Sequence, residues 1–414
     1  MKRNVLIIGA GGVAQVAAHK CAQNNDVLGD IHIASRKIAK CEGIIASVRE
    51  KGSLKNPDGV LQAHTIDAMD SAAVADLIRR TGAQIVINLG SAFVNMSVLE
   101  ACIAVGNVAY MDTAIHEDPA KVCEPPPWYA NHEWKRRARC AEAGVTAVLG
   151  VGFDPGVVNA YARLAEDRFV DDIRSVDIID INAGSHGRYF ATNFDPEINF
   201  REFTGTVLSW QKGQWQENRM FEVSNTWDLP VVGPQKAYLT GHDELHSLSA
   251  RYPRADLRFW MGFGDHYINV FTVLNNLGLL SEKPVRTAEG LEVVPLKVVK
   301  AVLPDPASLA PTYTGKTCIG DLVKGTKNGQ DTEVFIYNVA DHAEAYAEVG
   351  SQGISYTAGV PPVAAALLIA NGTWDTRTMV NVEDLDPAPF LTLMDGMGLP
   401  TRVRDARGDR PWNQ

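Results

Sequence analysis

The sequence predicts an α/β protein in which a doubly wound parallel sheet is followed by a second, α+β domain. Two observations carry this prediction. Strand-like apolar runs alternate with helical patterns as far as about residue 150, which is typical of a parallel sheet covered by helices on both faces. Beyond Gly152 the chain has more aromatic residues, alternating strand patterns such as residues 176–181, and few glycine turns, which favours a mostly antiparallel sheet.

The first predicted strand, residues 5–8, breaks directly into a glycine-rich turn. Gly9 lets the chain turn sharply, Gly11 lets the backbone approach a pyrophosphate, and Ala14 keeps the following helix close to the sheet. The N-terminus of that helix directs N–H groups and a positive dipole end at phosphates. The turn therefore predicts a dinucleotide site of the Rossmann type, against the alternative of a merely structural turn. The expected cofactor contacts are Gly9, Gly11, Gly12, Val13 and Ala14.

The end of the second predicted strand, residues 31–34, indicates which dinucleotide binds. An acidic residue near this position would bind the ribose 2′-hydroxyl of NAD, but Asp30 precedes the strand and the strand ends in Ser35, Arg36 and Lys37. A serine hydroxyl can donate to a 2′-phosphate, and basic side chains can pair with it. We therefore predict NADPH as the cofactor; a solvated basic helix start is the alternative.

Later strand-like runs lie at residues 61–65, 85–89, 108–111 and 145–149, with helical patterns at 72–80, 94–104 and 134–143. Ligands bind beyond the carboxyl ends of parallel strands, so the residues after each strand are candidates for cofactor contacts. They are Asp67 and Ala68 for the adenine edge, Asn88 and Gly90 for the ribose and nicotinamide, Asp112 and Thr113 for the nicotinamide or substrate, and Gly152 and Phe153. For the two aspartates, a turn carboxylate and a structural carboxylate are the alternatives.

The domain boundaries follow from these patterns. We expect residues 1–152 to form the dinucleotide-binding domain and residues 153–349 the substrate-binding α+β domain. A helix-like apolar run at residues 363–369 suggests that the chain returns, so that residues of about 350–414 complete the first domain. Asp154 stands before Pro155 at a predicted helix start and is interpreted as an N-cap or hinge.

Composition excludes several classes of protein. The six cysteines are far apart and show no Cys-x-x-Cys or metal-ligand spacing, so we expect reduced thiols and no metal site. A net charge of −10 argues against nucleic acid and favours a cationic small molecule. The sequence shows no signal peptide and no apolar stretch that we expect to span a bilayer, which predicts a cytoplasmic protein without a membrane partner. A homodimer is the default expectation for such a protein.

Four segments carry a family resemblance. Residues 9–14, 34–36, 152–156 and 359–362 resemble the saccharopine dehydrogenase-like oxidoreductases, and the similarity extends over most of the chain. Within that family, residues 180–187 and 240–245 are most similar to the carboxynorspermidine dehydrogenase subfamily. The resemblance implies that aspartate β-semialdehyde, an amino-aldehyde, condenses with 1,3-diaminopropane or putrescine, and that NADPH reduces the resulting imine.

That chemistry makes demands on the second domain. An alkylamine has a pKa of about 10.4, like lysine, and must lose a proton before it attacks an aldehyde. The distal ammonium needs a carboxylate, the amino-acid carboxylate needs a guanidinium or ammonium, and dehydration needs a proton donor. The candidates are His186, His242, His246 and Asp112 as acids or bases, Asp243 and Glu244 as ammonium partners, and Arg188 and Arg201 as carboxylate partners. A solvated helix N-terminus at residues 241–246 and ordinary surface arginines are the alternatives.

Two other functions remain open at this stage. A saccharopine reductase-type enzyme would join an amino acid to an aldehyde and would require more Arg and Lys in its pocket. A catalytically silent NADPH-binding regulator would share the fold without the reaction.

Overall fold

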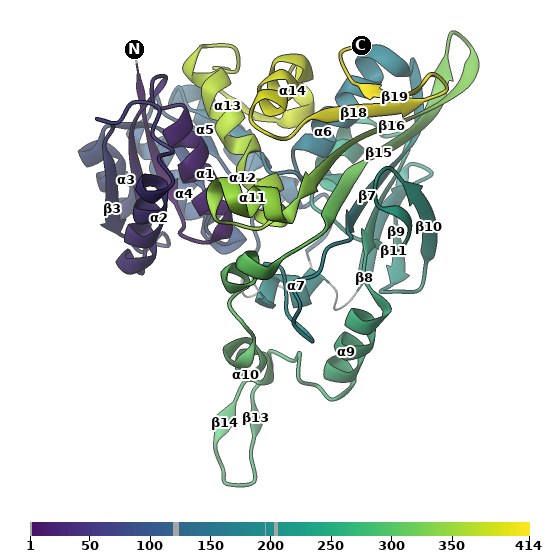
Figure 1. The fold of residues 1–414 in the computed structure, drawn as a ribbon, viewed down its shortest axis with the longest axis horizontal. Coiled ribbons are helices and arrows are strands. Elements are labelled where there is room, and N and C mark those ends of the chain that lie inside the picture. Colours follow the sequence, from purple (N-terminus) through teal and green to yellow (C-terminus); the bar gives the residue numbers. More distant parts are fainter. Residues whose placement is uncertain (1, 119–123, 195, 203–205) are drawn as a thin grey trace.

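The computed structural model describes residues 2–118, 124–194, 196–202 and 206–414. Two large sheets lie side by side (Figure 1). One is a seven-stranded sheet in the order β17-β6-β5-β4-β1-β2-β3, and the other is a ten-stranded sheet built around β7. The predicted fold class, a Rossmann-type parallel sheet with a second sheet domain, is confirmed.

The seven-stranded sheet is parallel throughout. Its strands are β1 (Arg3–Ile8), β2 (Leu28–Ser35), β3 (Leu61–Thr65), β4 (Ala83–Asn88), β5 (Ala109–Met111), β6 (Thr146–Leu149) and β17 (Met379–Asn381). The central strands are continuous apolar runs because both of their faces are covered. Val5 and Ile7 point into one buried cluster, and Leu6 and Ile8 point into a second cluster on the other face.

Helices cover both faces of this sheet. The first cluster includes residues of α1 (Gly12–Gln23) and α2 (Ile38–Glu50). The second cluster includes residues of α3 (Ser71–Thr81), α4 (Asn95–Val105) and α5 (Arg137–Glu142). The α3 helix begins after Asp70, whose side chain accepts from the Ala73 N–H, and ends at Gly82 in the left-handed conformation. These capping residues indicate in the sequence where α3 begins and ends.

The last part of the chain contributes to both sheets. The α11 (His342–Val349), α12 (Gly353–Gly359) and α13 (Pro361–Ala370) helices contact α1, and β17 pairs with β6 at the sheet edge. In contrast, β18 (Thr401–Asp405) and β19 (Gly408–Pro411) extend the other sheet from β16 (Gln330–Asp341). The α14 helix (Pro387–Gly396) lies between, against α13 and α6 (Val157–Leu164). Within residues 350–414, β17 thus belongs to the parallel sheet of the expected first domain, whereas β18 and β19 belong to the other sheet.

The α12 and α13 helices also correct one expectation from the sequence. Residues 353–370 are long enough and apolar enough to cross a membrane by length and composition, whereas no such stretch was expected. In the structure 83% of this stretch is buried inside the protein. Its composition is that of a core helix packed on all sides.

The ten-stranded sheet is mixed. At its centre β7 (Asp172–Asn182) pairs parallel with β12 (Asp256–Gly262) and antiparallel with β15 (Lys316–Lys327), which pairs with β16. The remaining strands are β8 (Thr206–Gln211), β9 (Gln214–Arg219), β10 (Ser224–Leu229) and β11 (Gly233–Thr240), all in antiparallel pairs. Along β7, Ile178 packs into the large cluster shared with the parallel sheet, whereas Ile179 and Ile181 pack into a separate cluster. One face of the mixed sheet therefore points toward the parallel sheet.

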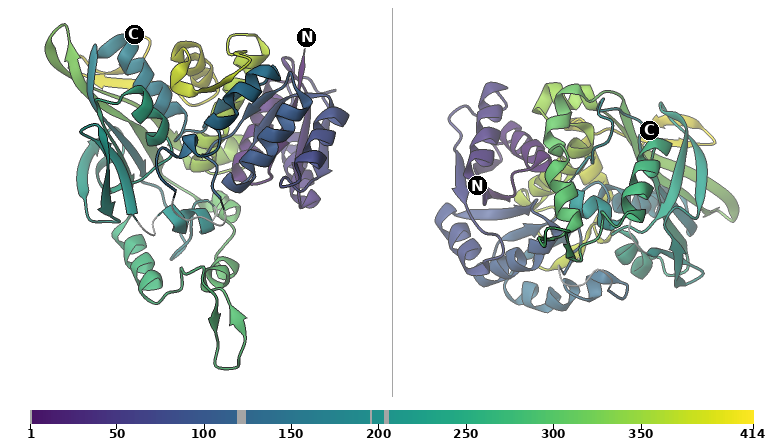
Figure 2. Two further views of the ribbon diagram at one scale, coloured as in Figure 1. Left: turned by 180° about the vertical axis from the view of Figure 1, so that it is seen from behind. Right: turned by 90° about the horizontal axis from the view of Figure 1, so that it is seen from below.

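Several short elements complete the second part of the chain. The α8 helix (Leu245–Arg251) packs against β12 and β8. The α7 (Pro196–Glu202), α9 (Asp265–Asn276) and α10 (Pro295–Val302) helices lie below the mixed sheet in the view of Figure 1. From there a hairpin of β13 (Val285–Arg286) and β14 (Glu292–Val293) projects away from the body, as both side views show (Figures 1 and 2).

Candidate active site

The glycine turn after β1 has the geometry that the motif requires. Gly9 has a φ of 115°, and a Cβ there would lie 2.4 Å from the Leu89 carbonyl oxygen. A Cβ on Gly12 would lie 2.6 Å from the Ser355 hydroxyl, whereas a Cβ on Gly11 would meet nothing within 4 Å. Gly9 and Gly12 are thus fixed by close packing, and the space beside Gly11 fits a pyrophosphate at the N-terminus of α1.

The basic end of β2 lies at the surface on the same edge. Arg36 and Lys37 are exposed, and the Ser35 hydroxyl accepts from the Lys37 N–H at 3.2 Å. Lys40, one helical turn further, pairs with Asp305 of the second part of the chain at 3.2 Å. This concentration of cations fits the 2′-phosphate of NADP, with Ser35, Arg36 and Lys37 as the predicted contacts.

The polar groups after β3 and β4 have hydrogen-bond partners within the protein. Asp67 accepts from the Met69 N–H at 3.1 Å, and the Ala68 carbonyl accepts from Ser97. Asn88 is buried; its amide donates to Asn95 at 2.8 Å and accepts from the Gly90 N–H at 3.2 Å. These bonds account for the polar groups in the turn, and contact of these residues with the cofactor stays a prediction.

Asp112 lies at the end of β5 and is 1% exposed. One carboxylate oxygen accepts from the Gly150 N–H at 2.7 Å, and the other accepts from the Tyr110 hydroxyl at 2.8 Å. Burial raises the pKa of Asp112 to about 7, and the charge of Asp243 acts in the same direction. At neutral pH this carboxyl can therefore hold or release a proton, which suits a general acid or base.

The loop after β6 differs from expectation. Asp154 is not an N-cap: α6 begins at Val157, and the Gly156 N–H before it donates to the Asn159 side chain at 2.8 Å. Asp154 instead shares a hydrogen bond with Asp180 of β7. Loss of solvation raises the pKa of Asp154 well above its usual range, with Asp180 adding to the effect, and it also raises the pKa of Asp180. These shifts favour a hydrogen bond in which the protonated Asp154 is the donor and Asp180 the acceptor.

Of the other residues predicted for this loop, Thr113 is partly exposed and lies against Gly152, where a Cβ would meet the Thr113 side chain at 3.4 Å. Phe153 is 1% exposed and packs edge-on against Tyr161. Its ring therefore belongs to the core beneath the loop, and only the backbone of Phe153 remains as a predicted cofactor contact.

Residues 242–246 join the two parts of the molecule. Asp243 accepts from the Ile115 N–H at 2.6 Å, and His246 accepts from the Trp128 N–H at 3.1 Å. His246 is buried and stacked against Trp128 and Trp215, and burial lowers its pKa to about 3. The interpretation as a solvated helix start is therefore wrong, and His246 is a neutral packing residue rather than an acid.

His242 and Glu244 are hydrogen-bonded to each other in this segment. His242 Nδ1 lies 2.6 Å from Glu244 Oε2, and its ring stacks on Phe259 at 4.0 Å. Glu244 is completely buried, and its Oε1 has no hydrogen-bond partner. Desolvation raises the pKa of Asp243 to about 6, while the positive charge of His242 opposes the rise. His242 also acts on Asp154 and Asp180 in the same sense, so it is the shared cation of the group.

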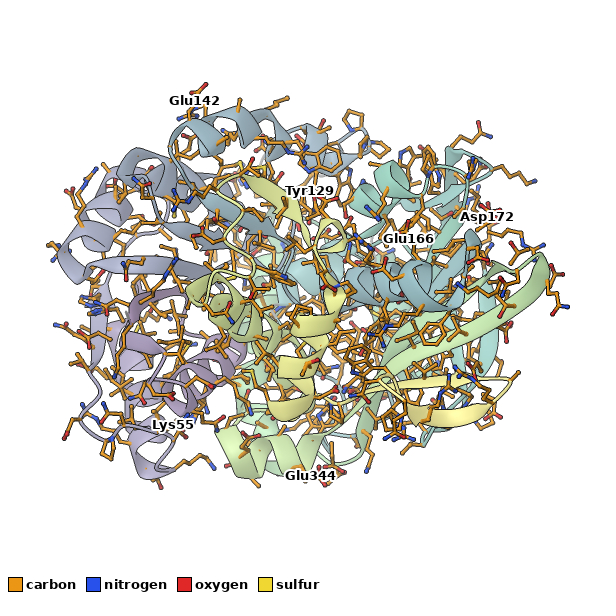
Figure 3. All side chains as sticks on the ribbon, turned by 90° about the horizontal axis from the view of Figure 1, so that it is seen from above. Lys55, Tyr129, Glu142, Glu166, Asp172 and Glu344 are labelled. Atoms are coloured by element: carbon orange, nitrogen blue, oxygen red, sulfur yellow. The ribbon has the colours of Figure 1, made fainter. Side chains whose placement is uncertain are left out.

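Two further buried carboxyls face this group. Glu133 accepts from the His116 N–H at 2.7 Å and leaves Oε2 without a partner; burial and then Asp112 raise its pKa. Asp321 of β15 is fully buried, and neither of its oxygens has a partner. We name the whole set the acid cluster: Asp112, Glu133, Asp154, Asp180, Asp243, Glu244 and Asp321, with His242. Figure 3 shows the buried Tyr129, whose pKa these charges raise further, between the elements of the two sheets.

His186 and Arg188 lie elsewhere, in the loop after β7. His186 Nδ1 accepts from the Arg188 N–H at 3.0 Å, and its ring contacts Tyr313. Arg188 is exposed. His186 thus lies against Tyr313, whereas His242 lies against Glu244 and Phe259. The side chain of Arg201 lies outside the described residues.

Sequence reasoning missed Glu133, Asp180 and Asp321 and gave Asp154 another role. A usable signal was present for two of them. Asp180 follows Ile178 on the inward face of β7, and Asp321 precedes Val323 on the inward face of β15. A carboxylate in the middle of a buried apolar row is rare unless it has a partner or a task.

Comparisons with known proteins agree with this geometry. The family model described as the saccharopine dehydrogenase NADP binding domain matches residues 5–148, and the one described as the saccharopine dehydrogenase C-terminal domain matches residues 152–399. A carboxynorspermidine synthase of Vibrio alginolyticus is 46% identical over 98% of both chains, and one of Vibrio cholerae is 45% identical over 99% of this chain and 98% of its own.

Two more distant comparisons extend this result. A carboxyaminopropylagmatine dehydrogenase of Synechocystis is 42% identical over 96% of both chains. The solved structure of apo saccharopine dehydrogenase (L-Glu forming) from Saccharomyces cerevisiae has 13% identity and a TM-score of 0.70, over 98% of this chain and all of that one, which shows a shared fold. The chain belongs to the saccharopine dehydrogenase family and is an NADP-dependent oxidoreductase.

Proposed function

We propose that the protein condenses L-aspartate β-semialdehyde with 1,3-diaminopropane or putrescine and reduces the product with NADPH, giving carboxynorspermidine or carboxyspermidine in polyamine biosynthesis. The acid cluster is the observation that carries this proposal. Its carboxyls influence one another in pairs, and His242 lowers the pKa of Asp154, Asp180 and Asp243. A site so poor in positive charge is suited to a substrate that brings its own.

The raised pKa of Asp112 supports a role in proton transfer. The amine arrives as an ammonium, and Asp112 in its ionised form accepts the proton that must leave before the nitrogen attacks the aldehyde carbon. The protonated carboxyl then donates to the departing hydroxyl of the carbinolamine, so that water leaves and a protonated imine forms. When bound, NADPH would supply a hydride to the imine carbon. Ser35, Arg36, Lys37 and the glycine turn would hold that cofactor.

The acid cluster also discriminates between the alternatives. A saccharopine reductase-type enzyme binds an amino acid as the amine, whose carboxylates would be repelled by Asp180 and Glu244. Agmatine is a second candidate amine, because one relative is named carboxyaminopropylagmatine dehydrogenase and a guanidinium can donate two parallel hydrogen bonds to a carboxylate. The buried carboxylate oxygens of Asp321 could accept such a pair.

Purified protein mixed with NADPH and aspartate β-semialdehyde tests the proposal. 1,3-Diaminopropane, putrescine, agmatine and glutamate are added in turn, and the absorbance of the reduced nicotinamide is followed. Oxidation with a diamine or with agmatine, but not with glutamate, is the expected result and ranks the amines. Oxidation with glutamate alone would favour the saccharopine reductase type, and tight NADPH binding without oxidation by any amine would favour the silent regulator.

A further inference from the structure

Asp321 is a buried carboxyl whose presence the fold does not explain. It lies in the middle of β15, where it is opposite Ile178 of β7 and Ile336 of β16, and its side chain is fully buried. Neither carboxylate oxygen has a hydrogen-bond partner. A buried polar group without partners is costly, so its retention calls for an explanation.

A structural carboxylate in the same sheet, in contrast, has hydrogen-bond donors. Asp177 lies on the opposite face of β7 and is also buried. It accepts from Arg258 Nε at 2.6 Å, from Arg258 Nη2 at 3.0 Å and from the Trp260 indole at 2.9 Å. The protein thus supplies donors to a carboxylate that serves the fold. Asp321 receives none, which indicates that its donors come from outside the chain.

The position of Asp321 directs it toward the acid cluster. In the β7–β15 pairing Asp180 is opposite Ile319, so Asp321 lies two residues further along the same face. Such diagonal neighbours lie roughly 7–8 Å apart. The charges of Glu244 and Asp154 act on Asp321, and Oε1 of Glu244 is also without a partner. Three unfilled acceptor atoms therefore belong to two neighbouring carboxyls.

The residues of the cluster differ in exposure. Asp154, Asp180, His242 and Asp243 are partly accessible, whereas Asp112, Glu133, Glu244 and Asp321 are buried. The charge of Asp243 acts on Asp112 at the edge of the parallel sheet, where the NADP-binding residues lie. An amine substrate whose reactive nitrogen lies near Asp112 would therefore extend past Asp243 and His242 toward Asp321.

We propose that Asp321, together with Oε1 of Glu244, binds the distal cationic group of the amine substrate, and that the depth of Asp321 sets the length of the amine that is accepted. This inference rests on the proposed function. A distal ammonium has three donors and matches the three unfilled acceptors. Binding of the cation also favours the ionised form of Asp321, whose pKa is raised by burial in the free enzyme, so the amine should displace a proton.

The test compares amines that differ only in the distal group: 1,3-diaminopropane with propylamine, and putrescine with butylamine. Asp321→Asn keeps the shape and removes the charge, and Asp331→Asn at the exposed start of β16 is the matched control. We expect Asp321→Asn to raise KM for the diamine on the order of 10- to 100-fold, as for loss of a charged hydrogen bond, and to leave the monoamines unchanged. KM for the aldehyde and Kd for NADPH should not change in either variant.

A second variant tests the length rule. Asp321→Glu brings the carboxylate one methylene closer to the reacting end, so it should shift the preference from putrescine toward 1,3-diaminopropane. If Asp321→Asn retains the wild-type preference for diamines over monoamines, or Asp321→Glu retains the wild-type length preference, the proposed role of Asp321 is wrong although the proposed function stands.

Calorimetry of amine binding, without aldehyde, separates failure of this inference from failure of the function. If none of the amines supports NADPH oxidation by the wild type, the proposed function fails. Weaker binding of the diamine to Asp321→Asn would still support a cation site at Asp321. If the variants do not fold, wild-type binding decides: tighter binding of the diamine than of the monoamine, with release of a proton, supports the inference, and equal binding without release contradicts it.

Discussion

In the proposed mechanism, Asp112 is the residue that accepts and returns the proton. Its carboxyl lies at the end of β5, is buried, and has a pKa raised to about 7. Asp112→Asn removes the proton acceptor while retaining the shape, so we expect kcat to fall on the order of 100- to 10,000-fold. Steady-state kinetics measure this, and a fall of less than threefold would exclude Asp112 as the acid or base.

The same substitution has a predictable effect on stability. Because the folded pKa of Asp112 lies above the unfolded value of 3.8, its contribution is fully present below that value and is lost as pH rises through about 7. Asparagine mimics the protonated form at every pH. The Tm of Asp112→Asn minus that of the wild type should therefore increase as pH rises from about 4 to about 8. A difference that is independent of pH would contradict the raised pKa.

Arg36 tests the cofactor assignment at the residue scale. Its exposed guanidinium follows β2 and is expected to pair with the 2′-phosphate. Arg36→Ala should raise Kd for NADPH roughly 10- to 100-fold and leave Kd for NADH unchanged, as measured by quenching of protein fluorescence. Arg49→Ala, in the last turn of α2, is the control. Equal weakening of both dinucleotides by Arg36→Ala would place the 2′-phosphate elsewhere.

Among the elements, the β1–α1 turn was the most predictable because its requirements are local. Gly9 has a positive φ and lies against the Leu89 backbone. Both features favour glycine because it has no Cβ. Gly9→Ala should therefore lower the free energy of unfolding by about 1–3 kcal/mol and abolish NADPH binding. Thermal unfolding and cofactor titration check this.

Gly43→Ala is the control for the turn. Gly43 lies in the interior of α2, and a Cβ there meets nothing within 4 Å. Alanine should stabilise this helix by about 0.5–1 kcal/mol and leave NADPH binding intact. If Gly9→Ala behaves like Gly43→Ala, the turn is less constrained than its geometry implies.

The acid cluster was only partly predictable, for a reason that also lies at this scale. His242, Asp243 and Glu244 are adjacent in the sequence, and their polar density made them candidates. Asp180 and Asp321 are brought together by the pairing of β7 with β15, two strands separated by more than one hundred residues. The pattern of a single sequence indicates where helices and strands lie but not which strands pair. From the sequence, these two residues are therefore ordinary carboxylates in strands.

At the scale of the whole molecule, the late helices hold the first helix in place. Lys20 of α1 is 2% exposed, pairs with Glu348 of α11 and donates to the Met397 carbonyl at 2.7 Å. Glu348→Ala would leave a buried ammonium with one acceptor, so we expect a loss of about 1–3 kcal/mol in the free energy of unfolding, measured with urea. Glu344→Ala is the control, since Glu344 lies at the periphery of the same helix (Figure 3). Equal effects of the two variants would show that the buried pair contributes nothing.

The two sheets have distinct tasks in this account. The parallel sheet presents the glycine turn and basic strand end to NADP, and the mixed sheet contributes Asp180 and Asp321 on the face that points back toward it. The fold class, the strand positions and the cofactor edge could be predicted because they repeat locally along the chain. The division of residues 350–414 between both sheets could not, because β17 and β18 are both short and show no preference for a sheet in their own sequence.

The acid cluster is proposed to receive a cationic amine for NADPH-dependent reductive condensation. The decisive experiment is the initial rate of NADPH oxidation by the wild-type enzyme with aspartate β-semialdehyde and saturating putrescine, compared with the rate when glutamate replaces the diamine. We expect rapid oxidation with putrescine or 1,3-diaminopropane and none above background with glutamate. Oxidation that requires glutamate and ignores every diamine would contradict it.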